Sequence, residues 1–157
     1  MVRGYRLAYY TAFFPVVNEL TCLVFVFDFD GVLARGDEPR ELGVRFLAKA
    51  VKLGGRVYIV SGRRPRDRGV IRTILKEAGI GLNRLRGLYL REAGSEEAFK
   101  LEVYREIYDR EGCIGEIHDD NPEALWPARK LVDHGLILHY DDYCEVLYGY
   151  SILDSCR

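Results

Sequence analysis

Short apolar runs alternate with amphipathic helical segments along most of this 157-residue chain. The run CLVFVF at 22–27 is uninterrupted, as expected for a strand that is covered on both faces. Further strands are predicted at 56–60, 88–90, 114–118 and 136–140. Helical segments separate these strands, and Gly54 and Gly79 end two of the helices. This alternation predicts an α/β fold with a three-layer, doubly wound parallel sheet.

The two ends of the chain are less regular. We expect an N-terminal extension at 1–19, followed by a single domain at 20–157. The extension is basic and then apolar, like a signal peptide, but no small-residue cleavage site follows, and the run is shorter than the ~20 residues that cross a bilayer. We therefore predict a cytoplasmic protein with no membrane segment. Residues 143–152 are predicted to add an edge strand or a packed tail, and 121–132 a helix with proline at its first position.

Composition and charge narrow the class of protein. Hydrophobic residues make up 48% of the chain and charged residues 30%, which is typical of a globular protein. The net charge of −1 means that nucleic-acid binding can be argued only from local clusters of basic residues. The four cysteines contain no C-x-x-C pair, which gives a zinc site little support. We expect them to be reduced, with a Cys144–Cys156 disulfide as the alternative.

Two carboxylates come directly after the first predicted strand. Asp28 and Asp30 are two residues apart on an extended chain, so their side chains project to the same side. Gly31 then lets the backbone turn sharply. Because two carboxylates this close do not both stay ionised without a cation, the pair predicts a metal ion or a raised pKa.

Other predicted strands end in groups that complement these carboxylates. Ser61-Gly62 offers a hydroxyl and a backbone amide to an anion, and Asp119-Asp120 offers the hard oxygen ligands that Mg²⁺ prefers. Lys100, near the start of a predicted helix, supplies a positive charge. Each group alone has an ordinary explanation as a turn, a helix cap or a surface residue. Together, at the carboxyl ends of parallel strands, they predict one metal-binding pocket of phosphate size.

The motifs that carry these groups resemble those of the haloacid dehalogenase (HAD) superfamily. FDFDGVL resembles motif I, with its D-x-D-G-[TV] pattern, and VSGR at 60–63 resembles motif II. Lys100 fits motif III, and HDD at 118–120 fits motif IV. The runs SGRRPRDRG, LYLREAG, FKLEVYREIY and IHDDNPEALW are spaced as in the phosphatase domain of polynucleotide kinase–phosphatases, although no kinase domain and no Gly-rich nucleotide loop are present. The resemblance covers about residues 20–140 and implies a HAD-like Rossmannoid fold.

The resemblance implies a role for each matching residue. Asp28 would be the nucleophile that forms an aspartyl-phosphate, and Asp30 would protonate the leaving oxygen and then activate water. Ser61 and Lys100 would bind the phosphoryl group and balance its charge.

The resemblance also implies a Mg²⁺ cofactor. Asp28, the Asp30 backbone carbonyl and Asp119 would hold the ion. Asp120 is the alternative direct ligand, or it orients the other ligands, as could Glu123.

The spacing of the motifs leaves no room for a lid domain. The segment between Asp28 and Ser61 is long enough for a turn, one helix and a strand, and the segment between Ser61 and Asp119 is filled by two helices and a short strand. We therefore expect a capless enzyme whose pocket admits the end of a macromolecule.

Several arginines flank the predicted phosphate-binding residues. With Gly62, the residues Arg63, Arg64 and Arg66 are candidates for substrate binding, and others are Arg68, Arg84, Arg86 and Arg91. They form either a basic rim for a phosphodiester backbone or a solvated face that is paired with acidic residues. The remaining aromatic candidates are expected to be structural or packed: His118, His134, His139, Trp126, Tyr140, Tyr143, Tyr148 and Tyr150.

These observations favour a Mg²⁺-dependent phosphatase that acts on 3′-phosphate ends of nucleic acids. One alternative is a phosphatase for nucleotides or other small phosphomonoesters. Another, from a different class, is a receiver-like signalling module that carries a phospho-aspartate without turnover. The predicted partner is a phosphorylated substrate, and nothing in the sequence indicates an obligate protein partner.

Overall fold

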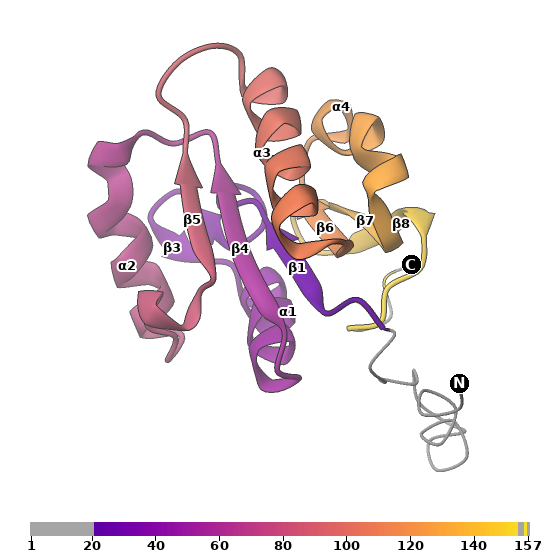
Figure 1. Cartoon of the computed structure of the whole chain (residues 1–157). Coiled ribbons are helices and arrows are strands. Elements are labelled where there is room, and N and C mark those ends of the chain that lie inside the picture. Colours follow the sequence, from indigo (N-terminus) through magenta and orange to yellow (C-terminus); the bar gives the residue numbers. More distant parts are fainter. Residues whose placement is uncertain (1–20, 154–155, 157) are drawn as a thin grey trace.

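The computed structural model describes residues 21–153 and 156. At its centre is a six-stranded sheet in the order β5-β4-β1-β6-β7-β8 (Figure 1). The strands are β1 (Val24–Phe27), β4 (Arg56–Ser61), β5 (Gly87–Leu90), β6 (Ile114–Asp119), β7 (Val132–His139) and β8 (Cys144–Gly149). All neighbouring pairs are parallel except β7 and β8, whose short connection at 140–143 permits only an antiparallel hairpin. The predicted α/β class is confirmed.

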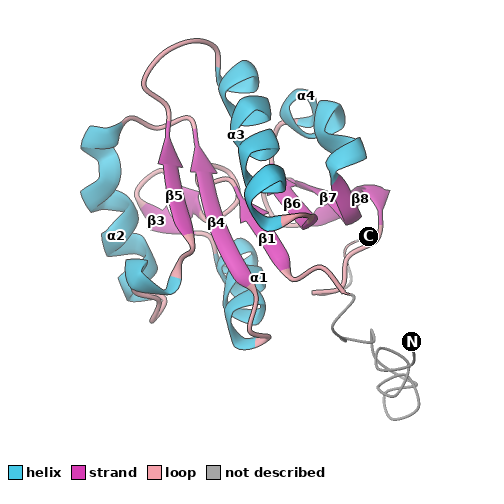
Figure 2. Cartoon of the chain, viewed as in Figure 1, coloured by secondary structure: helices cyan, strands magenta, loops and turns pink. Residues whose placement is uncertain are grey.

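Helices cover both faces of the sheet, so the molecule has three layers (Figure 2). The helices are α1 (Glu41–Lys52), α2 (Arg68–Glu77), α3 (Glu96–Glu111) and α4 (Pro122–Leu125), the last continuing into the 3₁₀ segment η4 (Trp126–Leu131). Because successive strand residues face opposite sides, Phe25 and Phe27 pack with Phe46 of α1, while Val24 and Val26 face the side of α3 and α4. Both packing faces of β1 are completely buried, as its apolar run predicts.

The alternation of strands and helices is interrupted only by small elements in the described part of the chain. Between β1 and α1 lies a hairpin of β2 (Ala34–Arg35) and β3 (Glu38–Pro39). Short 3₁₀ turns, η2 (Pro65–Asp67) and η3 (Leu82–Arg84), flank α2. Within residues 21–153, no inserted segment has the size of a lid domain, as the motif spacing predicts.

The segment after β6 differs from the predicted helix at 121–132. Asn121 caps α4 through its side chain and Pro122 occupies the first turn, both as expected. The α-helix nevertheless ends at Leu125 and continues as η4, where Pro127 stands near the start. Proline cannot donate the backbone hydrogen bond that a continuing α-helix requires, which explains the change. The edge strand expected within 143–152 is β8.

The expectation of reduced cysteines is wrong for Cys22 and Cys113, and for Cys144 and Cys156 the disulfide alternative is the one observed. Cys22 is disulfide-bonded to Cys113 and Cys144 to Cys156. The first pair lies beside the starts of β1 and β6, which are parallel neighbours, so both residues reach the same edge of the sheet. Their separation of 91 residues gives no local sequence signal. Disulfides occur in oxidising compartments and in hyperthermophile cytosols, and the cytoplasmic location stays a prediction.

The predicted extension at 1–19 lies outside the described residues. In the part that is described, the helices are all too short or too polar to cross a membrane.

Candidate active site

A hollow of about 440 Å³ opens at the carboxyl ends of β1, β4 and β6. Its lining consists of Asp28, Asp30, Gly62, Arg63, Glu96, Asp120, Asn121 and Pro122. Five of these residues were predicted from the sequence to be site residues, and they come from three separate strand ends. The structure therefore brings most of the predicted constellation into one place.

Asp28 is held at the end of β1 with only 3% of its surface exposed. Its backbone N–H donates to the carbonyl of His118 (2.8 Å), which joins the ends of β1 and β6. Its Oδ1 accepts hydrogen bonds from the Phe29 backbone N–H (2.7 Å) and lies 3.2 Å from Lys100 Nζ. Burial raises the pKa of this carboxyl well above its ordinary value, and the nearby charge of Asp119 raises it further.

Lys100 is fully buried on α3, whose N-terminus is capped by the Ser95 side chain. Its Nζ lies 2.8 Å from Asp119 Oδ2, 2.9 Å from Glu96 Oε2 and 3.2 Å from Asp28 Oδ1. Burial alone would lower the pKa of this amine, but the charges of Asp28 and Asp119 outweigh it and raise the pKa above its ordinary value. Lys100 is therefore a permanent positive charge inside a group of carboxylates.

Asp119 and Asp120 differ in their surroundings. Asp119 is fully buried: its Oδ2 accepts from Lys100 Nζ and from the Tyr104 hydroxyl (3.3 Å), and its Oδ1 from the Asn121 backbone N–H (3.1 Å). Asp120 instead lines the hollow. Burial and the charge of Asp119 raise the pKa of Asp120 to about 6. Both oxygens of Asp119 are thus engaged by protein donors, while Asp120 faces the opening.

The carboxylates form a suitable donor set for a divalent cation. Carboxylate oxygens of Asp28, Asp119 and Asp120 all lie within 4.8 Å of one another. Glu96 adds a fourth carboxylate at the hollow, and Lys100 is the cation that touches three of them. Hard oxygen donors with excess negative charge fit Mg²⁺, which is often bound by one or two carboxylates with its other positions left for water and phosphate.

Asp30 is bound by Arg63 in the structure. The Arg63 Nε lies 3.0 Å from Asp30 Oδ2 and its Nη2 lies 2.9 Å from Oδ1, which is a two-pronged ion pair. The hydrogen bond to Asp30 raises the pKa of Arg63. About half of the Asp30 side chain is exposed, so this pair borders solvent. Arg63 therefore lies at the predicted site, where its guanidinium is paired with the Asp30 carboxylate.

The Ser61-Gly62 turn is tightly packed. Ser61 is fully buried, and its Oγ accepts from the Arg63 backbone N–H (3.0 Å), so this side chain closes the turn and does not line the hollow. Gly62 does line it, and a Cβ added there would lie 2.6 Å from the Glu96 carboxylate. A side chain at residue 62 would therefore displace Glu96, the carboxylate that contacts Lys100.

The other arginines do not gather at this hollow. Arg64 donates to the Glu92 carbonyl (2.6 Å), and Arg64 and Arg66 line a separate hollow of about 410 Å³. Arg91 donates to the carbonyls of Gly62 and Gly94 and so supports the turn from behind. Arg86 pairs with Glu111. The arginines are thus divided between two hollows and a surface paired with acidic residues, so each of the two predicted alternatives describes only some of them.

Three residues of the site were missed from the sequence. Glu96 and Tyr104 lie four residues before and four after Lys100 on α3, and this spacing places all three on one helix face. That periodicity around Lys100 is the signal that could have found them. Asn121 follows the Asp119-Asp120 pair directly, and its side chain, which accepts from the Glu123 backbone N–H, caps α4.

The other aromatic predictions have mixed outcomes. His118, His134 and His139 are buried and hydrogen-bonded, in agreement with a structural role. The expected packing is confirmed in part: Trp126 packs edge-on against Tyr148 and Tyr140 stacks on Tyr143, although these four side chains and Tyr150 keep between 36% and 55% of their surface accessible. They lie on the edge hairpin and on η4, which lack a covering layer in the described chain.

Comparison with known proteins finds similarity only at the level of solved structures. Neither a family model nor a curated protein matches the chain. A protein from Vibrio cholerae, named as a 3-deoxy-D-manno-octulosonate 8-phosphate phosphatase, aligns with a TM-score of 0.47 and 18% identity over 78% of this chain and 72% of its own. A p-nitrophenyl phosphatase from Archaeoglobus fulgidus aligns with a TM-score of 0.39 and 17% identity over 71% of this chain and 39% of its own. These similarities concern the arrangement of strands and helices.

Proposed function

We propose that the protein hydrolyses phosphomonoesters in the hollow at Asp28. The reaction would pass through an aspartyl-phosphate, with Mg²⁺ as cofactor. The observation that carries this proposal is the contact of a fully buried Lys100 with Asp28 and Asp119, beside the hollow that Asp120 lines. A carboxylate that is buried next to a fixed positive charge is suited to attack an anionic phosphorus centre, because the lysine offsets the charge repulsion.

The proposed reaction has two displacements at phosphorus. A carboxylate oxygen of Asp28 attacks phosphorus, the ester P–O bond breaks, and the leaving oxygen takes a proton from Asp30. Water then attacks the phosphorus of the aspartyl-phosphate and gives a proton to Asp30. Inorganic phosphate leaves, and the Asp28 carboxylate is restored. Lys100 balances the negative charge in both steps.

Arg63 occupies both carboxylate oxygens of Asp30 in the structure, so Asp30 can exchange a proton with the leaving group only when Arg63 has moved away. Arg63 borders the same hollow, so we propose that it turns from Asp30 to the phosphoryl oxygens when substrate binds. Guanidinium groups bind phosphate in the same two-pronged manner as carboxylate. Substrate binding would thereby release Asp30 for proton transfer.

Asp28, Asp120 and the Asp30 backbone carbonyl are the proposed Mg²⁺ ligands. Asp119 is assigned to positioning Lys100, because both of its oxygens accept hydrogen bonds from protein donors. A bound Mg²⁺ would neutralise charge on the phosphoryl oxygens and on the two carboxylates.

A nucleic-acid 3′-phosphate end is the proposed substrate class. In its favour, the described chain has no lid domain, and Arg64 and Arg66 line a hollow beside the Ser61-Gly62 turn. Small phosphomonoesters are the alternative. The receiver-like alternative predicts a stable phospho-aspartate without turnover, which a single-turnover measurement separates from hydrolysis.

The experiment is phosphate release from a panel of 3′- and 5′-phosphorylated oligonucleotides, nucleotides and sugar phosphates, with Mg²⁺ or with EDTA. We expect Mg²⁺-dependent turnover, with Ca²⁺ supporting little because its coordination is looser. Asp28→Asn should be inactive, while Asp109→Asn, an exposed carboxylate on α3, serves as the control. Full activity after exhaustive chelation, or no hydrolysis of any substrate with Mg²⁺, would contradict the proposal.

A further inference from the structure

Besides the hollow that Arg64 and Arg66 line, another hollow of about 410 Å³ shares Asp120 with the hollow at Asp28. We call it the second hollow. It is lined by Gly31, Asp120, His139, Tyr140, Asp141 and Tyr143. Asp120 belongs to both hollows, and it packs so closely on Gly31 that a Cβ there would come 2.0 Å from its Oδ2. If a phosphomonoester binds with its phosphate at Asp28, its organic group therefore has the second hollow beside it, beyond Asp120.

The aromatic side chains of this second hollow form a stacked pair. The rings of Tyr140 and Tyr143 are 4.5 Å apart between centroids and 14° from parallel. Tyr143 is 54% exposed and Tyr140 36%. The Tyr140 hydroxyl donates to Glu145 (2.5 Å), which fixes the orientation of its ring. Exposed, flat aromatic faces of this kind bind planar rings by stacking.

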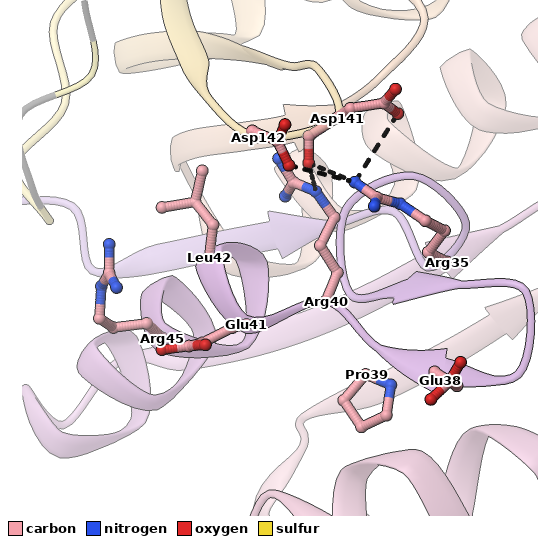
Figure 3. Close-up of a pocket in the computed structure, with 9 residues that line it drawn as sticks. All are labelled: Arg35, Glu38, Pro39, Arg40, Glu41, Leu42, Arg45, Asp141 and Asp142. Atoms are coloured by element: carbon pink, nitrogen blue, oxygen red, sulfur yellow. Dashed lines mark hydrogen bonds and ion pairs between the residues drawn. The ribbon is translucent and has the colours of Figure 1, made fainter.

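The turn that carries the two tyrosines is held from beneath by Arg40. This guanidinium, only 5% exposed, donates to the backbone carbonyls of Tyr140, Asp141 and Tyr143. Figure 3 shows Arg40 and Arg35 converging on Asp141 and Asp142. The Tyr140 N–H also donates to the Tyr143 carbonyl (2.8 Å), which closes the hairpin. A ligand would meet a surface that is already ordered, so little ordering entropy opposes binding.

The charge of the second hollow decides which ligand it suits. Among the described residues, its lining contains the carboxylates of Asp120 and Asp141 and no lysine or arginine. A second phosphate would be repelled there, whereas an uncharged ring with N–H or O–H donors would find acceptors. A nucleobase with its ribose has this combination of a planar ring and donors.

We propose that the second hollow binds the nucleobase of the nucleotide whose phosphate is attacked by Asp28, with Tyr143 as the stacking residue. This inference rests on the proposed phosphatase function and adds a specificity site to it. It applies equally to a free nucleotide and to the terminal nucleotide of a strand, since the base next to the phosphate is the same in both.

The kinetic test compares adenosine 5′-monophosphate with ribose 5-phosphate, which share the leaving hydroxyl and differ by the base. Adenosine 3′-monophosphate is assayed in parallel. We expect the wild-type protein to prefer the nucleotides in kcat/KM, and Tyr143→Ala to lower this preference by about tenfold, as loss of one stacking contact predicts. Tyr143→Phe keeps the ring and should keep the preference. Tyr148→Ala, a tyrosine of similar exposure on β8, is the matched control.

A binding measurement separates this inference from the proposed function. In Asp28→Asn protein, calorimetry should show tighter binding of adenosine 5′-monophosphate than of ribose 5-phosphate, and adding Tyr143→Ala should remove the difference. Base-dependent binding without hydrolysis by the wild type would support the site and contradict the phosphatase. Hydrolysis with an unchanged preference in Tyr143→Ala, or equal or undetectable binding of both ligands, would overturn the nucleobase site.

Discussion

Strand β6 carries two buried networks of ionisable groups that differ in how their charges are balanced. On the face toward α1, Arg40 Nη1 contacts His139 Nδ1 (3.0 Å), His139 Nε2 contacts His118 Nδ1 (2.9 Å), and His118 Nε2 contacts Glu116 Oε1 (3.0 Å). Because an arginine can only donate, the hydrogen-bond pattern assigns Nδ1 of each imidazole as the acceptor and Nε2 as the donor. Burial and the neighbouring His118 and Arg40 also lower the pKa of His139 to about 2. One cation and one anion thus close this network.

On the face toward α3, Lys100 contacts three carboxylates, and Asp120 adds a fourth near them. The negative charge is in excess, and this network borders a hollow. The balanced network needs no further charge, whereas the unbalanced one leaves negative charge that a bound cation would offset. In the proposed function, Mg²⁺ would supply the missing positive charge.

The largest expected effect comes from Asp28→Asn. We expect phosphate release to fall by at least about a thousandfold, because the nucleophile is lost. The thermal midpoint should stay the same or rise, since one carboxylate is removed from an excess of negative charge. Activity assays and thermal denaturation of the same samples check this. Substantial residual turnover would exclude the covalent mechanism.

Removing a charge from the balanced network should instead lower the stability of the fold. Glu116→Gln removes the negative charge at the end of the chain of contacts that runs from Arg40 through the two histidines. The Glu116 carboxylate also accepts hydrogen bonds from the Ser151 hydroxyl and the Ile152 backbone N–H. An amide accepts at only one of its two positions, so a buried donor loses its partner, which costs on the order of 1–3 kcal/mol in the free energy of unfolding. Chemical denaturation measures the loss. If Glu116→Gln is as stable as the wild type, the two networks do not differ as proposed.

The pH dependence of the unbalanced network is a smaller effect. The pKa of Asp120 is about 6, above its ordinary value of 3.8, so the metal-free folded protein holds this proton more tightly than the unfolded chain. Its contribution to stability is therefore complete below about pH 4 and is lost as the pH rises through 6. Mg²⁺ competes with the proton and should bind about tenfold more tightly at pH 7 than at pH 5. Thermal shifts in a Mg²⁺ titration at both pH values test this, and Asp120→Asn should flatten the difference.

The smallest effect concerns arginines that belong to neither network. Arg64→Ala or Arg66→Ala should lower the preference for a 3′-phosphorylated oligonucleotide over a mononucleotide by a few-fold at most, because each removes one exposed phosphate contact. The preference should also shrink as salt rises. Arg105→Ala, an exposed arginine on α3 that lines neither hollow, is the control. Equal efficiency on both substrates at low salt would leave a phosphatase for small phosphomonoesters.

The sequence predicted the parallel sheet and most of the hollow for one physical reason. Residues that end buried parallel strands must meet at one edge, so Asp28, Gly62 and Asp120 could be grouped without coordinates. The choice between Asp119 and Asp120 could not be predicted, because it depends on which carboxylate turns toward Lys100. The Arg63–Asp30 pair was likewise hidden, since a flexible side chain can reach several partners.

Contacts between distant segments account for the other differences. The Arg40–His139 contact joins residues that lie 99 apart, and no local pattern marks either of them as partners. Cys22 and Cys113 lie 91 residues apart, and no local pattern marks them as partners either. Exposure of Tyr143 depends on β8 being an edge strand, which the sequence left open between a strand and a packed tail.

The Cys22–Cys113 disulfide closes a covalent ring that contains most of the proposed catalytic residues. The ring spans 91 residues and contains Asp28, Ser61 and Lys100, while Asp119 and Asp120 follow just outside it. Closing a ring of this length removes roughly 4–5 kcal/mol of chain entropy from the unfolded state. A protease that cuts one exposed loop inside the ring, such as the turn at Gly36, would open the circle without releasing a fragment. Asp28 and Lys100 would then stay tethered to each other until the disulfide is reduced.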